Sequence, residues 1–483
     1  MSTSLDTFEP QLVWERFLEL TRIARPPKHE AAAREHVLAW AGARGFSSAV
    51  DVAGNVVVRI PAAVGRKTAP TVVLQSHLDM VCERDPESPY DPREGRINVL
   101  LEDDWLLADG TTLGADNGIG VAAAMAVAEE EDLAHGRLEL LFTVSEEQGL
   151  EGAKQLDPEL VSGRLLVNLD GGDDGITIGC AGSIHTFTRL HLSLEPTPNG
   201  HVALDVRVSG VKGGHSGADI AAGRINANKA LARILSRMYE QHPFRLSLLE
   251  GGVSRNAIPR DAHAVVCAPE GAVDALREAA EGELASLRGE FRRSDPDLAL
   301  SIESGQATDS ASETTTARAL DLVAATPTGV IAMNPELRGV VETSTSLTVV
   351  STDEDVLTLA SMTRSASPEA LEEVETSLLA LARLAGAEMD VVRSYPPWQP
   401  ELASRLLGVA RDTWRRLFGT EPELVVVHGG LECAVIGGRV PGIEMVSLGP
   451  EIEGPHAPGE RVRVTSTQRF YRLLGALLDD LSR

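Results

Sequence analysis

Short, continuously apolar runs alternate with helical segments in the first third of the chain, and this alternation constrains the fold most strongly. The apolar runs occupy residues 55–60, 71–75, 138–144 and 164–169. An alanine-rich stretch, IGVAAAMAVAEEE, lies between the second and third runs and has the composition of a helix. Strands buried on both faces read as continuous apolar runs, and their alternation with helices favours a parallel sheet covered by helices. The pattern predicts an α/β domain with a mostly parallel sheet.

The pattern changes after about residue 185. Residues 185–194 and 201–210 alternate apolar with polar side chains, which is typical of strands with one face in water. A helix-like segment, NANKALARILSRMYE, follows, and strand-rich stretches come near 330–350 and 387–393. The middle of the chain is therefore predicted to form an α+β domain with an antiparallel sheet.

The end of the chain returns to the first pattern. A helix is expected near 401–417, strands at 423–428 and 443–448, and a final amphipathic helix from about Ser466. The simplest organisation is one α/β domain built from both ends of the chain, with a second domain inserted into it. We place the first part at 1–184, the inserted domain at 185–395 and the second part at 396–483.

Charge and composition exclude several classes of protein. The chain of 483 residues carries 44 Lys and Arg against 71 Asp and Glu, a formal net charge of −27. This charge repels phosphate backbones and anionic lipid, so we expect no nucleic-acid partner and no membrane partner, whereas it suits a protein that collects cations. The sequence has no apolar run of about 18 residues that would span a bilayer.

Cysteine usage and the first residues indicate the cytosol. The four cysteines show no CxxC spacing, so no cysteine zinc site is expected, and so few in a long chain predict reduced thiols. The opening stretch, MSTSLDTFEPQLVWERF, has neither the basic start nor the apolar core of a signal peptide.

Histidine and acidic residues follow the predicted strands one after another. The carboxyl ends of parallel strands form one rim, where ligands bind. The residues at this rim are His77 and Asp79, Asp116 before the alanine-rich helix, Glu146 and Glu147, Asp170, and His456. Imidazole nitrogen and carboxylate oxygen are ligands that suit zinc, cobalt or manganese. The sequence therefore predicts a metal site at this rim.

Each of these residues also has an ordinary structural interpretation. His77 alone would be a hydrogen-bonded histidine of the core, Asp116 a helix N-cap, Asp170 a turn residue and His456 a surface side chain. A Glu-Glu pair alone would be a solvated turn. Their joint occurrence at successive strand ends favours the metal site over these separate interpretations.

The set fits two metal ions about 3.5–4 Å apart. Asp116 can bridge both ions with its two carboxylate oxygens. His77 and Asp170 would complete the ligands of one ion, and Glu147 and His456 those of the other.

Two acidic residues remain beside these ligands. Glu146 is left without a metal, and a free carboxylate there can take a proton from the attacking water and return it to the leaving nitrogen. Asp79 would accept the second ring N–H of His77 and so fix its tautomer. The constellation predicts a metal-dependent hydrolase.

The motifs that carry these residues resemble the M20 family of di-zinc peptidases. They are SHLDM, GTTLGADNGIG, FTVSEEQG, NLD and GPHAPGE, in this order. Further segments, GCAGS, GGHSG with NANKAL, RNAIPR, GVVETSTSL and HGGLEC, are similar to the aminoacyl-histidine dipeptidase branch of that family. The resemblance covers nearly the whole chain, from PPKHE to the final helix. It implies a catalytic domain with an inserted α+β lid domain, two ions of Zn²⁺ (Co²⁺ and Mn²⁺ being alternatives), and hydrolysis of unblocked dipeptides, with a preference for Xaa-His substrates.

The resemblance also implies roles for residues of the inserted domain. His215 matches a lid histidine that reaches the partner subunit's site and polarises the scissile carbonyl, which implies a homodimer through the lid. Asn256 matches a residue that contacts the substrate amide, and Arg364 one that binds the substrate carboxylate. A lid turn and a surface arginine are the ordinary alternatives. For Glu432 two interpretations stay open, which are a contact with the free amine of the substrate and a buried structural carboxylate.

Two other functions remain open at this stage. One is a different amide hydrolase on the same scaffold, namely an aminoacylase, a tripeptidase or a dipeptidase for β-linked or isopeptide bonds. The catalytic residues do not separate these reactions, because the lid determines the substrate. The other is a binding or regulatory protein that has kept the fold without turnover. A lid over the rim leaves room for a small peptide only.

Overall fold

The computed structural model describes residues 8–173 and 175–483. Residues 1–7 and Asp174 lie outside the described residues. The predicted first part, 1–184, includes all of them, and the expectation about a signal peptide rests partly on residues 1–7. The chain divides into two compact units. The first contains the chain up to Cys180 together with Trp398–Val427 and Leu431–Arg483, and the second contains Ala181–Pro397 and His428–Gly430.

These units differ by a few residues from the predicted segments. A boundary after residue 184 would cut a strand of the second unit, β9, which runs unbroken over Gly182–His191. The structural division therefore falls between Cys180 and Ala181. His428 groups with the second unit, where its Nε2 lies 2.7 Å from the hydroxyl of Ser344.

An eight-stranded sheet forms the centre of the first unit. In spatial order its strands are β1 Ser47–Val50, β2 Val56–Ile60, β6 Leu138–Thr143, β3 Val72–His77, β7 Leu165–Asn168, β23 Glu444–Ser447, β8 Gly175–Cys180 and β22 Glu423–Val427. Pairs β6–β3, β3–β7, β7–β23 and β8–β22 are parallel, and the remaining pairs are antiparallel. The α/β class with a mostly parallel sheet is confirmed, and antiparallel pairs occur toward both edges of the sheet.

Helices cover this sheet because its central strands are apolar on both faces. Every residue of β3 and of β6 is buried. The helices of the first unit are α1 Gln11–Leu20, α2 Ala31–Ala43, α3 Ala115–Glu129, α4 Glu151–Lys154, α9 Arg405–Phe418, α10 Glu432–Arg439 and α11 Val464–Leu481. The alanine-rich helix α3 packs against both α1 and β3, and small side chains on all its sides allow this double contact.

A small four-stranded sheet lies beside the start of α3. It consists of β24 Ile452–Glu453, β25 Arg461–Arg463, β5 Trp105–Ala108 and β4 Val99–Glu102. The β24–β25 hairpin carries His456 in its loop. The sheet thus joins a segment from the end of the chain to one that precedes α3.

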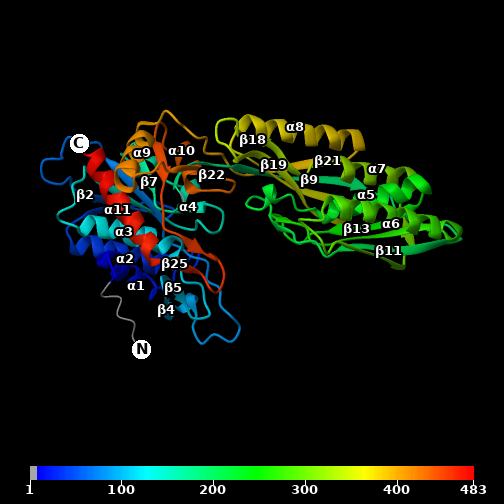
Figure 1. The fold of residues 1–483 in the computed structure, drawn as a ribbon, viewed down its shortest axis with the longest axis horizontal. Coiled ribbons are helices and arrows are strands. Elements are labelled where there is room, and N and C mark those ends of the chain that lie inside the picture. The colour runs from blue at the N-terminus through cyan, green and yellow to red at the C-terminus, as the bar shows by residue number, and fades with distance from the viewer. Residues whose placement is uncertain (1–7, 174) are drawn as a thin grey trace. The chain divides into compact units, whose positions relative to one another are not determined.

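The second unit contains an antiparallel sheet with helices packed against it. Its strands in spatial order are β16 Ala299–Ser304, β11 His201–Ser209, β15 Ala262–Pro269, β13 Arg245–Gly251, β19 Val341–Asp353, β20 Val356–Ser365, β9 and β21 Glu388–Tyr395, with β18 Gly329–Met333 paired to β19. The helices are α5 Ala227–Gln241, α6 Val273–Glu290, α7 Glu313–Ala325 and α8 Pro368–Ala385 (Figure 1). Two short ladders complete the unit, β10 Glu195–Pro196 with β17 Asp309–Ser310 and β12 Gly214–His215 with β14 Ala257–Ile258. Alternating burial along β11 fits the predicted half-exposed strands.

Cys82, Cys180, Cys267 and Cys433 are all free and buried. Among the described residues, no helix is both long and apolar enough to cross a membrane.

Candidate metal centre

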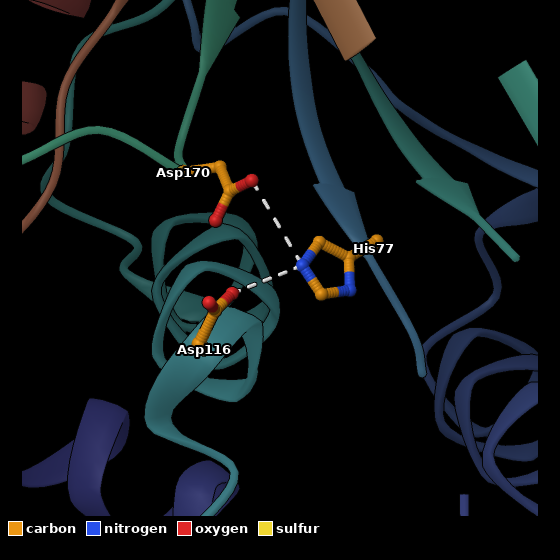
Figure 2. Close-up of side chains that lie close together, drawn as sticks. All are labelled: His77, Asp116 and Asp170. Atoms are coloured by element: carbon orange, nitrogen blue, oxygen red, sulfur yellow. Dashed lines mark hydrogen bonds and ion pairs between the residues drawn. The ribbon is translucent and has the colours of Figure 1, made fainter. Parts of the chain in front are cut away.

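The predicted ligands converge at the carboxyl ends of β3, β6 and β7. His77 is the last residue of β3, Asp170 lies two residues beyond β7, and Glu146 and Glu147 follow β6 after a turn. Figure 2 shows the ring of His77 facing the carboxylates of Asp116, in the first turn of α3, and of Asp170. Parallel pairing of β3 with both neighbours brings these three strand ends to one edge of the sheet.

Asp116 lies between two histidines. Its Oδ1 is 3.1 Å from His77 Nε2, and its Oδ2 is 3.3 Å from His456 Nε2. Each carboxylate oxygen thus faces a different imidazole, which is the arrangement of a bridging carboxylate. Asp170 Oδ2 is 3.8 Å from the same nitrogen of His77, and Glu147 Oε2 is 3.1 Å from that of His456.

The resulting groups have the composition of two adjoining metal sites. His77, Asp116 and Asp170 form one set whose ligand atoms lie within 4.8 Å of one another, and Asp116, Glu147 and His456 form another. Within the described part of the chain, the buried Oε1 of Glu147 has no hydrogen-bond partner. A donor set of two imidazoles and three carboxylates with an unused buried oxygen fits a divalent cation chemically.

Asp79 fixes the segment that carries Glu146 and Glu147. Its Oδ1 accepts the backbone N–H of Glu146 at 3.0 Å, and its Oδ2 accepts that of Glu147 at 3.1 Å. The Nδ1 of His77 lies 3.1 Å from the backbone carbonyl of Asp79 and 3.4 Å from its carboxylate. The carbonyl is therefore the nearer acceptor for the ring N–H, where the sequence predicted the carboxylate.

Glu146 lies beside this pair of sites. One carboxylate oxygen of Glu146, one of Glu147 and a ring nitrogen of His77 lie within 4.8 Å of one another. Ser145, just before it, has a left-handed backbone with φ 52°, which turns the chain sharply after β6. Burial, together with the charges of Asp170 and Glu147, raises the pKa of Glu146 well above its usual value.

Electrostatic interactions within the cluster are strong. Burial disfavours the protonated ring of His77, but the carboxylates of Asp170, Asp116 and Asp79 outweigh this effect and raise its pKa. Hydrogen bonds to Asp116 and Glu147 raise the pKa of His456 to about 10. Burial and the charge of Asp116 raise the pKa of Asp170, whereas hydrogen bonds from both histidines hold the pKa of Asp116 well below its usual range. The cluster attracts positive charge, as a cation site must.

Two buried residues that the sequence did not indicate hold the loops around Asp116. The carboxylate of Glu460 accepts the backbone N–H groups of Leu113, Gly114 and Asp116 at 2.8, 2.9 and 3.1 Å. The guanidinium of Arg25 donates to three backbone carbonyls, those of residues 78, 79 and 114. The only local signal for Glu460 is its place in the GPHAPGE motif.

A row of buried polar side chains contains Glu432 together with four residues that the sequence did not indicate. Four of its members stand near the carboxyl ends of four neighbouring strands, and they are Gln75, Thr143, Asn168 and Ser447. The fifth member, Glu432, is the first residue of α10. Glu432 is only 1% exposed and accepts hydrogen bonds from Gln75 and Thr143. Of its two open interpretations, this burial matches the structural carboxylate. A single polar residue near the end of an apolar strand was the available signal.

The predicted substrate-binding residues of the second unit form a separate group. Arg364 is 3% exposed and donates through Nη1 to the hydroxyl of Tyr395 at 3.1 Å, and its Nη2 lies 3.5 Å from His215 Nε2. His215 and Asn256 line one cavity of about 490 Å³. The side chain of Asn256 accepts a hydrogen bond from Ser254, so its amide is oriented.

The sheet and the residues at its rim define a class of protein, namely an α/β protein with a candidate multi-residue metal site of the kind that metal-dependent hydrolases use. Residues 73–480 match the family described as Peptidase family M20/M25/M40. The chain therefore belongs to this peptidase family.

Individual relatives agree with this assignment. The chain is 37% identical over 482 residues to the cytosol non-specific dipeptidase of Escherichia coli, covering 99% of each protein. The crystal structure of aminoacylhistidine dipeptidase from Vibrio alginolyticus superimposes with a TM-score of 0.91 at 34% identity, covering 99% of this chain and 98% of that one. Aminopeptidase PepT from Bacillus cereus, with a TM-score of 0.56 and 17% identity over 99% of this chain and 100% of that one, shares the fold.

Proposed function

We propose that the protein is a metal-dependent dipeptidase that hydrolyses unblocked dipeptides, and that Xaa-His dipeptides of the carnosine type are its preferred substrates. The observation that carries this proposal is the placement of Asp116 between His77 and His456, with Glu146 beside them. The names of the Escherichia coli and Vibrio alginolyticus relatives support dipeptides as the substrate class. The Escherichia coli relative is named a non-specific dipeptidase, whereas the name of the Vibrio alginolyticus relative specifies histidine. The preference for histidine is therefore the part of the proposal that the substrate panel tests.

The proposed cofactor is a pair of divalent ions, Zn²⁺ in the first place, with Co²⁺ or Mn²⁺ as alternatives. His77 and Asp170 would hold one ion, Glu147 and His456 the other, and Asp116 both. Bound ions would polarise the scissile carbonyl and lower the pKa of the attacking water. The two overlapping groups of ligand atoms support this assignment.

Glu146 is the proposed general base and acid. Its carboxylate would take the proton of the attacking water and deliver it to the leaving amide nitrogen. A raised pKa supports this role, since a base whose pKa lies nearer the working pH also serves as the acid in the second step. Asp79 would act as a positioning residue, because its carboxylate holds the backbone of the Glu146–Glu147 segment.

The second unit is proposed as a lid that binds the peptide. Arg364 would bind the substrate carboxylate, Asn256 the substrate amide, and His215 would polarise the scissile carbonyl in the partner subunit of a homodimer. The proximity of Arg364 to His215, and the cavity that His215 shares with Asn256, support one binding surface. We place the protein in the cytosol, as the name of the Escherichia coli relative suggests.

The first experiment is a hydrolysis panel with the full chain loaded with Zn²⁺ or Mn²⁺. The panel contains β-Ala-His, α-linked Xaa-His dipeptides, dipeptides without histidine, tripeptides and N-acetyl amino acids. We expect unblocked Xaa-His dipeptides to be hydrolysed fastest and N-acetyl substrates to be inert. Fastest hydrolysis of a tripeptide or an acylated amino acid would replace the proposed substrate with that of another amide hydrolase.

A second experiment tests the proton-transfer role. Glu146→Gln should retain the metal content of the wild type and lose most of its turnover, by roughly 100-fold or more, since positioned general bases contribute on that order. A matched control is Glu139→Gln, which changes a buried glutamate near the opposite end of β6. Near-full activity of Glu146→Gln would overturn the assignment. Turnover by neither the variant nor the wild type on the whole panel would favour a binding protein.

A further inference from the structure

The polar row of the first unit links one buried carboxylate to three of the strand ends that carry the candidate ligands. Gln75 Nε2 and Thr143 Oγ1 each donate to Glu432 Oε2 at 2.6 Å. Gln75 Oε1 accepts from Asn168 Nδ2 at 2.6 Å, and Ser447 Oγ donates to Asn168 Oδ1 at 2.5 Å. The row follows the sheet directly, since Gln75 is paired with Asn168, and Asn168 with Ser447.

Three of the four strand residues of this row, Gln75, Thr143 and Asn168, stand two or three positions before a predicted site residue. Gln75 precedes His77 by two positions on β3, and Asn168 precedes Asp170 by two positions beyond β7. The side chain of Asn168 also accepts the backbone N–H of Asp170 at 3.2 Å. The row is therefore the layer directly beneath the candidate metal centre, and Glu432 is its only charged member.

The carboxylate of Glu432 makes no salt bridge with any of the described residues. No lysine or arginine of the described chain forms an ion pair with Glu432, and its buried Oε1 has no hydrogen-bond partner among the described residues. A buried carboxylate with a free oxygen is unfavourable unless positive charge lies nearby. Burial raises the pKa of Glu432 to about 7 even though His77 favours the charged form.

The charged groups around Glu432 belong to the candidate metal centre. His77 favours its ionisation, while Asp79 opposes it, and Glu432 in turn raises the pKa of Glu146 and of Asp170. With metal ions at the rim, their positive charge would stabilise the ionised carboxylate of Glu432 beneath them. A residue buried for packing alone would be better served by glutamine or leucine.

We propose that Glu432 is a positioning residue of the metal centre, which supplies a buried negative charge beneath the strand ends and strengthens the binding of the divalent ions. This inference rests on the proposed metal-dependent function, and it assigns to Glu432 a role toward the metal ions instead of the substrate amine.

The hydrogen bonds of Glu432 allow charge to be removed without removing contacts. In Glu432→Gln the amide oxygen can accept from Gln75 and Thr143, and the amide nitrogen takes the place of the unpartnered Oε1. Glu432→Asp keeps the charge but shortens the side chain. Glu139→Gln is a matched control, since Glu139 is 3% exposed, belongs to the same sheet and accepts backbone hydrogen bonds from Ser162 and Gly163.

The test is the affinity of the metal-stripped full chain for Zn²⁺, measured in competition with a chromophoric chelator, together with the visible spectrum of the Co²⁺ form. We expect Glu432→Gln to bind Zn²⁺ about 10- to 100-fold more weakly, which is the usual effect of residues that support metal ligands. The Co²⁺ spectrum should stay that of the wild type, because the ligands themselves are unchanged. Glu139→Gln should bind Zn²⁺ within about twofold of the wild type, since its charge lies near the far end of the strand.

The outcomes separate the inference from the proposed function. A wild type that binds no metal overturns both. A wild type that binds metal, with Glu432→Gln binding it equally well, overturns the role of Glu432 alone. If Glu432→Gln does not fold, Glu432→Asp and Glu432→Leu decide, because a charge effect requires the aspartate variant to bind Zn²⁺ more tightly than the leucine variant. Equal losses in the two would show a purely structural role and refute the inference.

Discussion

Replacing Asp79 by asparagine should displace Glu146 while leaving the Glu146 side chain itself unchanged. In the wild type the two oxygens of Asp79 each accept one backbone N–H, from Glu146 and from Glu147, and Asp79 is fully buried. Asparagine is nearly isosteric but offers one oxygen and one NH₂ group. One backbone N–H would therefore face another donor in a site without access to water.

The size of the effect follows from these two contacts. A hydrogen bond to a buried carboxylate contributes about 1.5–3 kcal/mol, and an unsatisfied buried donor costs about 1–3 kcal/mol. We expect about 3–4 kcal/mol of this loss to fall on the Glu146–Glu147 segment, which positions the carboxylate of Glu146. At about 1.4 kcal/mol for each factor of ten, kcat/KM for a dipeptide should fall by about 10²- to 10³-fold.

The assay is steady-state hydrolysis of an Xaa-His dipeptide at saturating metal, with metal content measured in parallel. Glu139→Gln serves as the control, since its carboxylate also accepts two backbone N–H groups, at 2.9 Å each, on the same sheet. That control should lower the unfolding temperature while kcat/KM stays within about threefold of the wild type, because its contacts support no site residue. An Asp79→Asn variant that retained more than a tenth of the wild-type kcat/KM would refute the reasoning.

Three further predictions follow from the contacts of the first unit. The affinity of the metal-stripped protein for Zn²⁺ should rise between about pH 6 and pH 9, because metal must displace protons from His77 and His456, whose pKa values are raised. Calorimetry in buffers of different ionisation enthalpy should detect the release of protons on Zn²⁺ binding at about pH 7. The absence of proton release would contradict this prediction. Gly152→Ala should lower thermal stability by about 1–3 kcal/mol, because a methyl group there would collide with the carbonyl oxygen of Val144, and a thermal melt equal to that of the wild type would disprove the close approach. Arg25→Met should destabilise the first unit by about 3 kcal/mol or more in denaturant unfolding, because three backbone carbonyls lose their buried donor, and an unchanged midpoint would show that water replaces the guanidinium.

The elements at the centre of the first unit were predictable because burial on both faces leaves a clear pattern. The strands that lead to His77 and Asp170 are apolar over their first three residues, so the polar side chains that follow mark the strand ends. The structure brings His77, Asp116, Glu147, Asp170 and His456 together as the pattern indicated. The strand β1 and the helix α10 were not predicted, since a four-residue strand or an eight-residue helix carries too little periodicity.

Residues that support the site from a distance were not predictable in the same way. Glu460 caps the start of α3 from the far end of the chain, and no local spacing connects it with Asp116. Gln75 and Asn168 resemble ordinary strand ends until the register of β3 and β7 places them side by side. Such pairings depend on tertiary contacts, and a single sequence shows only the residue types involved.

The division of the first unit into separate stretches of the chain also determines when the site can exist during synthesis. Four of the five candidate ligands, ending with Asp170, precede the second unit in the chain, and His456 follows it. At about 5–20 residues per second, the ribosome needs roughly 15–60 s to make the ~290 residues between Asp170 and His456. A growing chain therefore exposes an incomplete ligand set throughout that interval, and a hydrolytic site is assembled only after the second unit has been made.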